Sequence, residues 1–170
     1  MSKSFIQLAR DRYSVRKYSD KPVEPEILRQ ILETGAVSPT AHNSQPQRIK
    51  VITEPEELKK LDQCTVCRFG APAALIICYD KDVCWKRDFD GAPSGEVDAS
   101  IVTTQLMYAA HDLGLGTCWV MFFDPAKTRE VFKLPDNIIP VAILPLGYPA
   151  EDAAPSPRHL QRVPLEETLI

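Results

Sequence analysis

Apolar residues recur at helical spacing in several stretches of the chain. The longest is residues 95–113, where apolar positions fall mostly three to five residues apart and Gly114 supplies a stop signal. Residues 24–37 repeat the pattern, with Pro25 in the first turn of the predicted helix. We expect three shorter helices, over residues 4–11, 55–62 and 125–132.

Apolar runs between these helices predict strands. Residues 48–53 alternate between polar and apolar positions, and residues 73–79 and 117–123 are continuous apolar runs typical of buried strands. Residues 138–146 predict a further strand that Pro140 and Pro145 interrupt. Helices and strands in this order predict an α+β or mixed-sheet layered domain.

Length and composition indicate one soluble globular domain, residues 1–170. The chain has 170 residues, of which 44% are hydrophobic and 25% are charged, and a chain of ~150 residues normally buries roughly 70% of its unfolded surface. Proline is abundant between Pro145 and Pro164. We therefore expect residues 150–170 to form an extended arm rather than more core.

Charge and hydropathy exclude two broad classes of partner. With 20 basic and 23 acidic residues the formal net charge is −3, so no basic excess attracts nucleic acid. No apolar run reaches the ~18–20 residues that span a bilayer. Residues 1–13 carry charges where a signal peptide would be apolar. We expect a cytoplasmic protein with no nucleic-acid or membrane partner.

Five scattered cysteines do not predict a disulfide framework, because their number is odd. Cys64 and Cys67 form a CxxC pair, which suits a redox pair or half of a zinc site. No second pair lies at ligand spacing. We therefore expect no metal site.

Residues 12–16 place two arginines around a serine directly after the first predicted helix. In an extended stretch, Arg12, Ser14 and Arg16 point to the same side. A guanidinium forms a bidentate charged fork and a serine hydroxyl adds a donor, so the set suits a phosphate. A solvated basic patch at a helix end is the alternative interpretation.

Three further segments have compositions that suit a ligand. Residues 38–46 combine amides and hydroxyls on a backbone pinned by two prolines, which suits recognition of a planar heterocycle as well as a polar surface loop. Residues 114–123 are nearly all apolar and suit either the floor under a flat ring or a plain core strand. Residues 158–167 form a basic patch near the C-terminus.

Taken in order, these four segments resemble the FMN-dependent nitroreductase family, where FMN is flavin mononucleotide. The resemblance runs from Arg12 to Glu167 and so covers nearly the whole chain. It implies a nitroreductase-like α+β fold with a central mixed, mainly antiparallel sheet flanked by helices. It also implies a homodimer with shared active sites, in which the C-terminal arm extends onto the partner subunit.

The resemblance implies FMN-binding residues in each of these segments. Arg12 and Ser14 match contacts to the phosphate and ribityl groups, Arg16 matches a basic residue at the pyrimidine edge, and Arg162 matches a second phosphate contact. The loop of residues 39–45 matches a segment contributed by the other subunit. The full set implied for cofactor binding is Arg12, Tyr13, Ser14, Arg16, Pro39, Thr40, Ala41, Asn43, Gln45, Trp119, Val120, Met121, Phe122 and Arg162.

Two details of this set bear on chemistry. The backbone N–H groups of Met121 and Phe122 match donors to flavin N5 and O4, and a donor at N5 orients the ring for hydride transfer. Ala41 stands where many family members carry a hydroxyl, and Met121 stands where compact members often carry glycine. The range of substrates therefore stays open.

The activity implied by the resemblance is that of an FMN-dependent NAD(P)H oxidoreductase. NADH or NADPH passes a hydride to flavin N5 and leaves, and a nitroaromatic, a quinone or a related conjugated electrophile then takes it, in a ping-pong sequence. The flavin carries the chemistry, so we expect no catalytic side chain. The alternative is a non-enzymatic thiol redox sensor, or a flavin-storing dimer, that uses Cys64 and Cys67.

Overall fold

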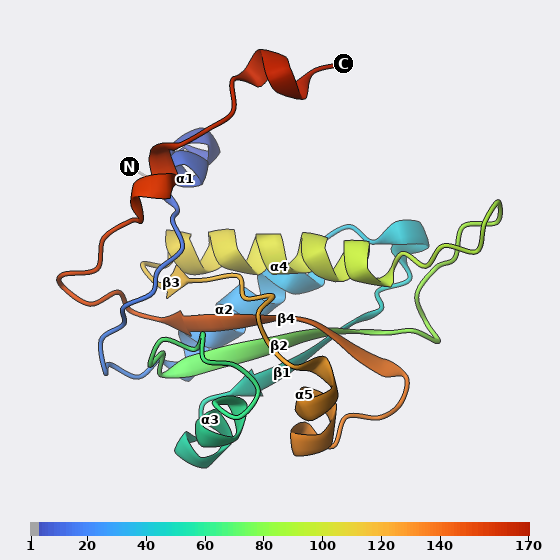
Figure 1. Ribbon diagram of the computed structural model, residues 1–170, viewed down its shortest axis with the longest axis horizontal. Helices are drawn as coiled ribbons and strands as arrows, with labels where there is room; N and C mark the ends of the chain where they lie inside the picture. The colour runs from blue at the N-terminus through green and yellow to red at the C-terminus, as the bar shows by residue number, and fades with distance from the viewer. Residues whose placement is uncertain (1–3) are drawn as a thin grey trace.

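A four-stranded sheet in the order β1-β2-β4-β3 forms the centre of the molecule (Figure 1). The structure is a computed structural model, and it describes residues 4–170. All three neighbouring pairs of strands are antiparallel. The strands are β1 (Gln47–Ile52), β2 (Ala73–Asp80), β3 (Gly116–Thr117) and β4 (Ile138–Gly147).

Helices cover both faces of this sheet, with α2 and α4 on one face and α3 and α5 on the other (Figure 1). α1 packs against α4, where Phe5 and Tyr108 meet edge to face with ring centroids 5.4 Å apart. The five predicted helices are confirmed to within one residue at each end. They are α1 (Phe5–Asp11), α2 (Pro25–Ala36), α3 (Pro55–Leu61), α4 (Gly95–Asp112) and α5 (Pro125–Phe132).

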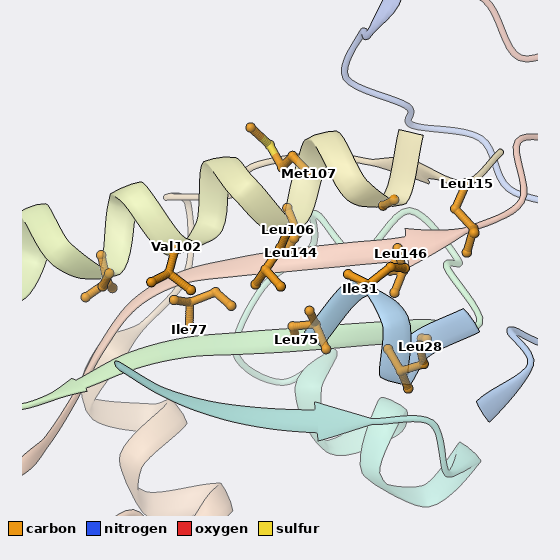
Figure 2. Packing of buried hydrophobic residues seen from close by; sticks show 14 of the residues in the cluster. Leu28, Ile31, Leu75, Ile77, Val102, Leu106, Met107, Leu115, Leu144 and Leu146 are labelled. Carbon is orange, nitrogen blue, oxygen red and sulfur yellow. The ribbon is translucent and has the colours of Figure 1, made fainter. Parts of the chain in front are cut away.

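β2 is buried along its whole length because helices cover both of its faces. Its side chains alternate, so Leu75 and Ile77 face α2 and α4 whereas Ile76 and Cys78 face α3 and α5. Each leucine or isoleucine buried in this way contributes about 1.5–3 kcal/mol. Figure 2 shows the first of these clusters, to which the two helices contribute Leu28, Ile31, Val102 and Leu106.

β4 runs without a break through Pro140 and Pro145, so the predicted interruption of this strand is wrong. Pro140 lies opposite Cys78, where the pairing with β2 shifts its register, and irregular positions of this kind tolerate proline. Pro145 turns its nitrogen toward the β3 side, because Ile143 exchanges both of its backbone bonds with Val120 on that side. Pro145 therefore costs β4 no backbone hydrogen bond to β2.

The strand predicted over residues 117–123 is also wrong. β3 covers only Gly116–Thr117, and the chain touches β4 again at an isolated bridge between Val120 and Ile143. The same register sets Cys118 opposite Pro145, which has no N–H to donate. The ladder is therefore interrupted at this proline, and after the bridge at Val120 the apolar run leaves the sheet.

The sheet is antiparallel rather than mixed. Among the described residues, parallel pairing is confined to an isolated bridge between Ser14 and Thr117. This bridge joins the stretch after α1 to the edge strand β3. The α+β class is confirmed, and the mixed sheet is the part of the expectation that changes.

The C-terminal arm leaves the body of the molecule beyond α1 (Figure 1). Residues 150–170 contain two short 3₁₀ helices, η2 (Pro157–Leu160) and η3 (Leu165–Thr168), and no buried residue. Its apolar side chains are largely exposed, at Leu160, Val163, Leu165 and Leu169. Contact of this arm with a partner stays a prediction. Within the described residues, no helix has the length and apolar content to cross a bilayer.

Candidate functional site

A basic pocket forms where the stretch after α1 meets the C-terminal arm. The cavity has a volume of about 220 Å³. Four arginines and no carboxylate are among its described lining residues, so the pocket suits an anion. It is lined by Arg12, Tyr13, Ser14, Arg16, Ser156, Arg158, His159 and Arg162.

The stretch after α1 is held extended by the edge of the sheet. The backbone N–H of Val15 donates to the carbonyl of Thr117 over 2.9 Å, and the Val15 side chain is buried. Side chains alternate in an extended stretch, so burial of Val15 turns Ser14 and Arg16 to the opposite side, where the pocket lies. Edge pairing therefore positions this half of the pocket.

Arg12 carries an unsatisfied donor. Its Nε is buried and has no hydrogen-bond partner, although buried side-chain donors are normally paired. By contrast, Arg162 Nη1 donates to the carbonyl of Gln161 over 2.8 Å, and Arg16 Nη1 donates to the carbonyl of Ser14 over 3.2 Å. An anion in the pocket would supply the partner that Arg12 lacks.

Tyr18 closes the gap between this stretch and β4. Its hydroxyl lies 2.9 Å from the carbonyl oxygen of Val15 and 3.3 Å from that of Pro145. Burial raises the pKa of Tyr18 above its ordinary value, so the group is a neutral hydrogen-bond donor. It lies at the point where β3 no longer pairs with β4.

Residues 119–124 run from β3 toward α5 and pair with β4 once, at Val120. Val120 N donates to Ile143 O over 2.9 Å and Ile143 N donates back over 3.0 Å. Beyond this point the side chains of Met121 and Phe122 are 65% and 75% exposed. Among the described residues, no hydrogen bond uses the amide of Met121 or of Phe122 as its donor. Two donors therefore stand free on an apolar segment.

The polar loop of residues 38–46 has a defined and strained shape. His42, Asn43 and Gln45 adopt positive φ angles of 53°, 53° and 47°, which cost non-glycine residues about 1–3 kcal/mol each. The loop is held by contacts elsewhere: Ala41 N donates to Asp98 Oδ1 over 2.8 Å, and the His42 ring stacks on Trp85 with centroids 5.1 Å apart. Strain maintained in this way is typical of functional loops.

The structure joins some of the predicted cofactor residues and separates others. Arg12, Tyr13, Ser14, Arg16 and Arg162 line one pocket. The loop with η1 (Ala41–Asn43) lies at the opposite end of α4 (Figure 1), and a helix of 18 residues is ~27 Å long. One chain therefore does not bring the loop of residues 39–45 to its own arginine pocket.

Three residues of the pocket were missed by sequence reasoning. Ser156, Arg158 and His159 line the cavity together with Arg162. The signal is the basic patch over residues 158–167, in which the resemblance implies a phosphate contact for Arg162 alone. Periodicity could not show that η2 folds back against the stretch after α1.

The CxxC pair lies in the turn that follows α3. Cys64 is 5% exposed, and burial raises the pKa of its thiol. Cys67 packs against the second apolar cluster and is half-buried. Burial of Cys64 favours its neutral thiol over the reactive thiolate, so the surroundings of Cys64 disfavour the thiol-sensor alternative.

Comparison with known proteins bears directly on this chain. A sequence profile described as the Nitroreductase family matches residues 9–68 and 65–148. The crystal structure of a nitroreductase family protein from Clostridium difficile 630 superposes with a TM-score of 0.93 at 43% identity, covering 99% of this chain and 98% of that chain. The likeness thus extends over the arm and the arginine pocket.

Two relatives carry functional names. A protein provisionally named NADH dehydrogenase/NAD(P)H nitroreductase from Methanothermobacter thermautotrophicus is 32% identical over 158 residues, which are 86% of this chain and 78% of that protein. The FMN reductase (NAD(P)H) of Bacillus subtilis is 30% identical over 174 residues, covering 90% of this chain and 69% of that protein. With the family profile matched over most of its length and its fold superposed on a solved member, this chain belongs to the nitroreductase family.

Proposed function

We propose that this chain is an FMN-dependent NAD(P)H oxidoreductase that reduces nitroaromatics, quinones or related conjugated electrophiles. The observation that carries the proposal is the four-arginine pocket, joined through β3 to a segment with two unpaired amides. The names of relatives, among them FMN reductase and NAD(P)H nitroreductase, support the same activity.

The residues of the pocket fit the phosphate of FMN. A phosphate monoester is a dianion at neutral pH and needs compensating charge in a partly desolvated site. Arg12, Arg158 and Arg162 supply that charge, and the unpaired Nε of Arg12 gains an acceptor. Ser14 adds a hydroxyl donor beside the guanidiniums.

The segment after β3 fits the ring of the same cofactor. The free amides of Met121 and Phe122 are donors for the N5 and O4 edge, and Arg16 supplies a cation for the pyrimidine edge. Bound FMN supplies the hydride-accepting and hydride-donating atom, N5, so that NAD(P)H and the electron acceptor take turns at one site. The chain's own residues bind and orient, and we assign no acid, base or nucleophile among them.

We also propose that two copies of the chain build each site. The loop of residues 39–45 lies too far from its own arginine pocket to share a ligand with it, so in this proposal a second copy supplies the loop. α4 leaves Val97 62% exposed and Ile101 38% exposed on the face away from the sheet. These apolar side chains, together with those of the arm, offer a surface that a second copy buries.

Purified protein tests the proposal directly. We expect a yellow protein whose flavin absorbance is bleached by NADH or NADPH without oxygen, and recovers when a quinone or nitroaromatic is added. Steady-state rates with each nicotinamide would define the donor. A protein that binds no FMN even when it is supplied in excess refutes the proposal.

The thiol alternative has its own test. A double variant, Cys64→Ser with Cys67→Ser, removes both thiols of the CxxC pair. We expect NAD(P)H oxidation to survive in this variant, since neither sulfur lines the arginine pocket. The sensor would be favoured instead if the wild type changed reversibly on thiol oxidation, the double variant did not, and both oxidised NAD(P)H at the same rate.

A further inference from the structure

The turn of residues 64–67 has no role in the function proposed above, yet it contacts the segment that carries the free amides. Thr65 is 6% exposed, and its hydroxyl lies 2.6 Å from the carbonyl oxygen of Phe122. Next to this bond, the amide of Asp124 donates to the carbonyl of Cys64 over 2.9 Å. The turn therefore holds residues 122–124 in place through two hydrogen bonds.

The hydrogen bonds determine which way the Thr65 hydroxyl points. The amide of Cys67 donates to Thr65 Oγ1 over 3.0 Å, so this oxygen is already an acceptor. A hydroxyl has one proton to donate, and the carbonyl of Phe122 can only accept. The proton of Thr65 therefore lies on the bond to Phe122.

Both peptide planes that flank Phe122 are held by hydrogen bonds. Phe123 N donates to Met121 O over 3.0 Å, which orients the plane that contains the Phe122 N–H. Thr65 orients the following plane through the Phe122 carbonyl. Since peptide units are planar, these two bonds set φ and ψ of Phe122 and with them the direction of its free N–H.

The turn is itself firmly anchored. The amides of Cys64 and Thr65 donate to the carbonyl of Leu61 at the end of α3, over 2.8 and 3.2 Å. Arg68 forms two bonds to Asp62, of 2.6 and 2.7 Å, which is the bidentate geometry of a strong pair. Thr65 thus links the end of α3, through its amide, to the exposed segment at Phe122, through its hydroxyl.

We propose that Thr65 is a positioning residue that holds the Phe122 amide in the orientation a flavin edge requires. The inference rests on the proposed function and deepens it. Thr65 acts through the Phe122 peptide and does not itself line the arginine pocket. It also gives a role to the turn that contains the CxxC pair: this turn braces the backbone donors.

Two substitutions isolate the hydroxyl. Thr65→Ser and Thr65→Ala both remove the methyl group, and the serine alone keeps the hydroxyl. We expect Thr65→Ala to bind FMN ~2- to 10-fold more weakly, the range for losing one hydrogen bond. We also expect a more negative flavin midpoint potential, because a misdirected N–H stabilises added negative charge less. Thr65→Ser should retain the wild-type affinity and potential.

Thr103 supplies a matched control. It is fully buried, and its hydroxyl lies 2.7 Å from the carbonyl oxygen of Ala99 inside α4, away from residues 119–124. Thr103→Ala removes a comparable bond, so it should lower the melting temperature while leaving FMN affinity and potential unchanged. If Thr65→Ala does not fold, Thr65→Val keeps the volume and replaces it in the comparison.

The outcomes separate the two ideas. A wild-type protein that binds no FMN overturns the proposed function and this inference with it. A wild-type protein that binds FMN, with Thr65→Ala equal to it in affinity and potential, overturns the role of Thr65 alone. An equal shift in Thr103→Ala does the same, because the effect would then follow from lost stability.

Discussion

Asp98 is a carboxylate with 1% of its surface exposed, and two neutral donors satisfy it. Its Oδ1 accepts from the amide of Ala41 over 2.8 Å, and its Oδ2 accepts from the hydroxyl of Ser94 over 2.6 Å. A buried charge is tolerated when it accepts well-formed bonds near the positive end of a helix. Asp98 thereby fastens the strained polar loop to the first turn of α4.

Replacing this carboxylate tests the fastening. Asp98→Asn keeps the shape but substitutes an NH₂ group for one acceptor, so one donor is left unpaired in the interior. We expect a loss of about 1–3 kcal/mol in the free energy of unfolding, measured in urea. Asp112→Asn, at an exposed position of the same helix, serves as the control and should change stability by less than about 0.5 kcal/mol.

Glu24 links the start of α2 to the end of β4. The Tyr148 hydroxyl lies 2.6 Å from Glu24 Oε2, and Lys21 Nζ lies 2.9 Å from Oε1. These contacts, the tyrosine first, lower the pKa of Glu24 to about 2. The unfolded chain has a glutamate pKa near 4.3, so this contribution to stability is present above that value and is lost as pH falls toward 2.

A pH series on Glu24→Gln checks this sign. The variant should melt at a lower temperature than the wild type at pH 7, and the gap should close as the pH falls from about 5 to about 2. Glu26→Gln on the same helix is the comparison. A gap that widens on acidification would contradict the assignment.

At the scale of elements, the stretch after α1 and the edge of the sheet depend on each other. A Cβ added at Gly116 would lie 2.4 Å from Cγ2 of Val15, closer than real contacts allow. Val15 and Gly116 are the chain neighbours of Ser14 and Thr117, which form the parallel bridge between the two segments. The absence of a side chain at Gly116 is therefore what allows the arginine-bearing stretch to approach β3.

A double-variant cycle measures this dependence. Gly116→Ala should lose about 1–3 kcal/mol of stability through overpacking, and FMN binding should weaken because Ser14 and the arginines shift. Val15→Ala removes the two clashing methyl groups and leaves the contact with Cβ, at 2.7 Å, so it relieves part of the clash. The double variant should therefore be more stable than the sum of the two losses indicates. Strict additivity would count against the contact.

The apolar run after β3 illustrates what periodicity leaves open at this scale. Residues 73–79 and 117–123 look alike in sequence, but the first is a buried central strand, whereas the second pairs with β4 in β3 and once more at Val120 before it leaves the sheet. Pro145, on the neighbouring strand, contributes to this difference because it has no N–H to donate to the carbonyl of Cys118, which interrupts the ladder between Thr117 and Val120. The conformation of this run thus depends on the neighbouring strand β4 as well as on its own sequence.

At the scale of the whole molecule, the arginine pocket joins the two ends of the chain. Arg12 and Arg162 are 150 residues apart in sequence and line the same cavity. The likeness to the nitroreductase family predicted both arginines at a phosphate. The chain folds so that this prediction is geometrically consistent, and Arg158 joins them.

Removing single arginines tests the assigned ligand. Arg12→Ala, Arg158→Ala and Arg162→Ala should each weaken FMN binding about 10- to 150-fold, since a charge-assisted bond contributes about 1.5–3 kcal/mol. Riboflavin, which lacks the phosphate, should bind these variants and the wild type with similar affinity. Arg29→Ala, which removes an exposed pair with Glu33 on α2, is the control. An equal loss for riboflavin would exclude the pocket as a phosphate site.

The second copy has a separate test. Val97→Glu with Ile101→Glu sets charges on the exposed face of α4, where a dimer would bury them without partners. We expect the wild type to sediment as a dimer and the variant as a monomer that binds FMN weakly. A wild type that stays monomeric at micromolar concentration with FMN bound would rule out the shared site.

Local information in the sequence was enough for the five helices, the buried strand β2 and the α+β class. Helix periodicity, first-turn prolines and capping residues act within a few positions, so they can be read without a fold. The four segments of the candidate site were also visible as compositions. Their order along the chain carried the resemblance to the family.

Tertiary structure decided what depends on distant partners. The end of β3 at Pro145, the return of η2 to Arg12, and the support of Phe122 by Thr65 join residues that no local pattern connects. Hydrogen bonds and burial between such residues are set by packing, because a donor is satisfied or left free according to what the fold brings beside it. Whether the amides of residues 121 and 122 stand free is therefore a property of the folded chain alone.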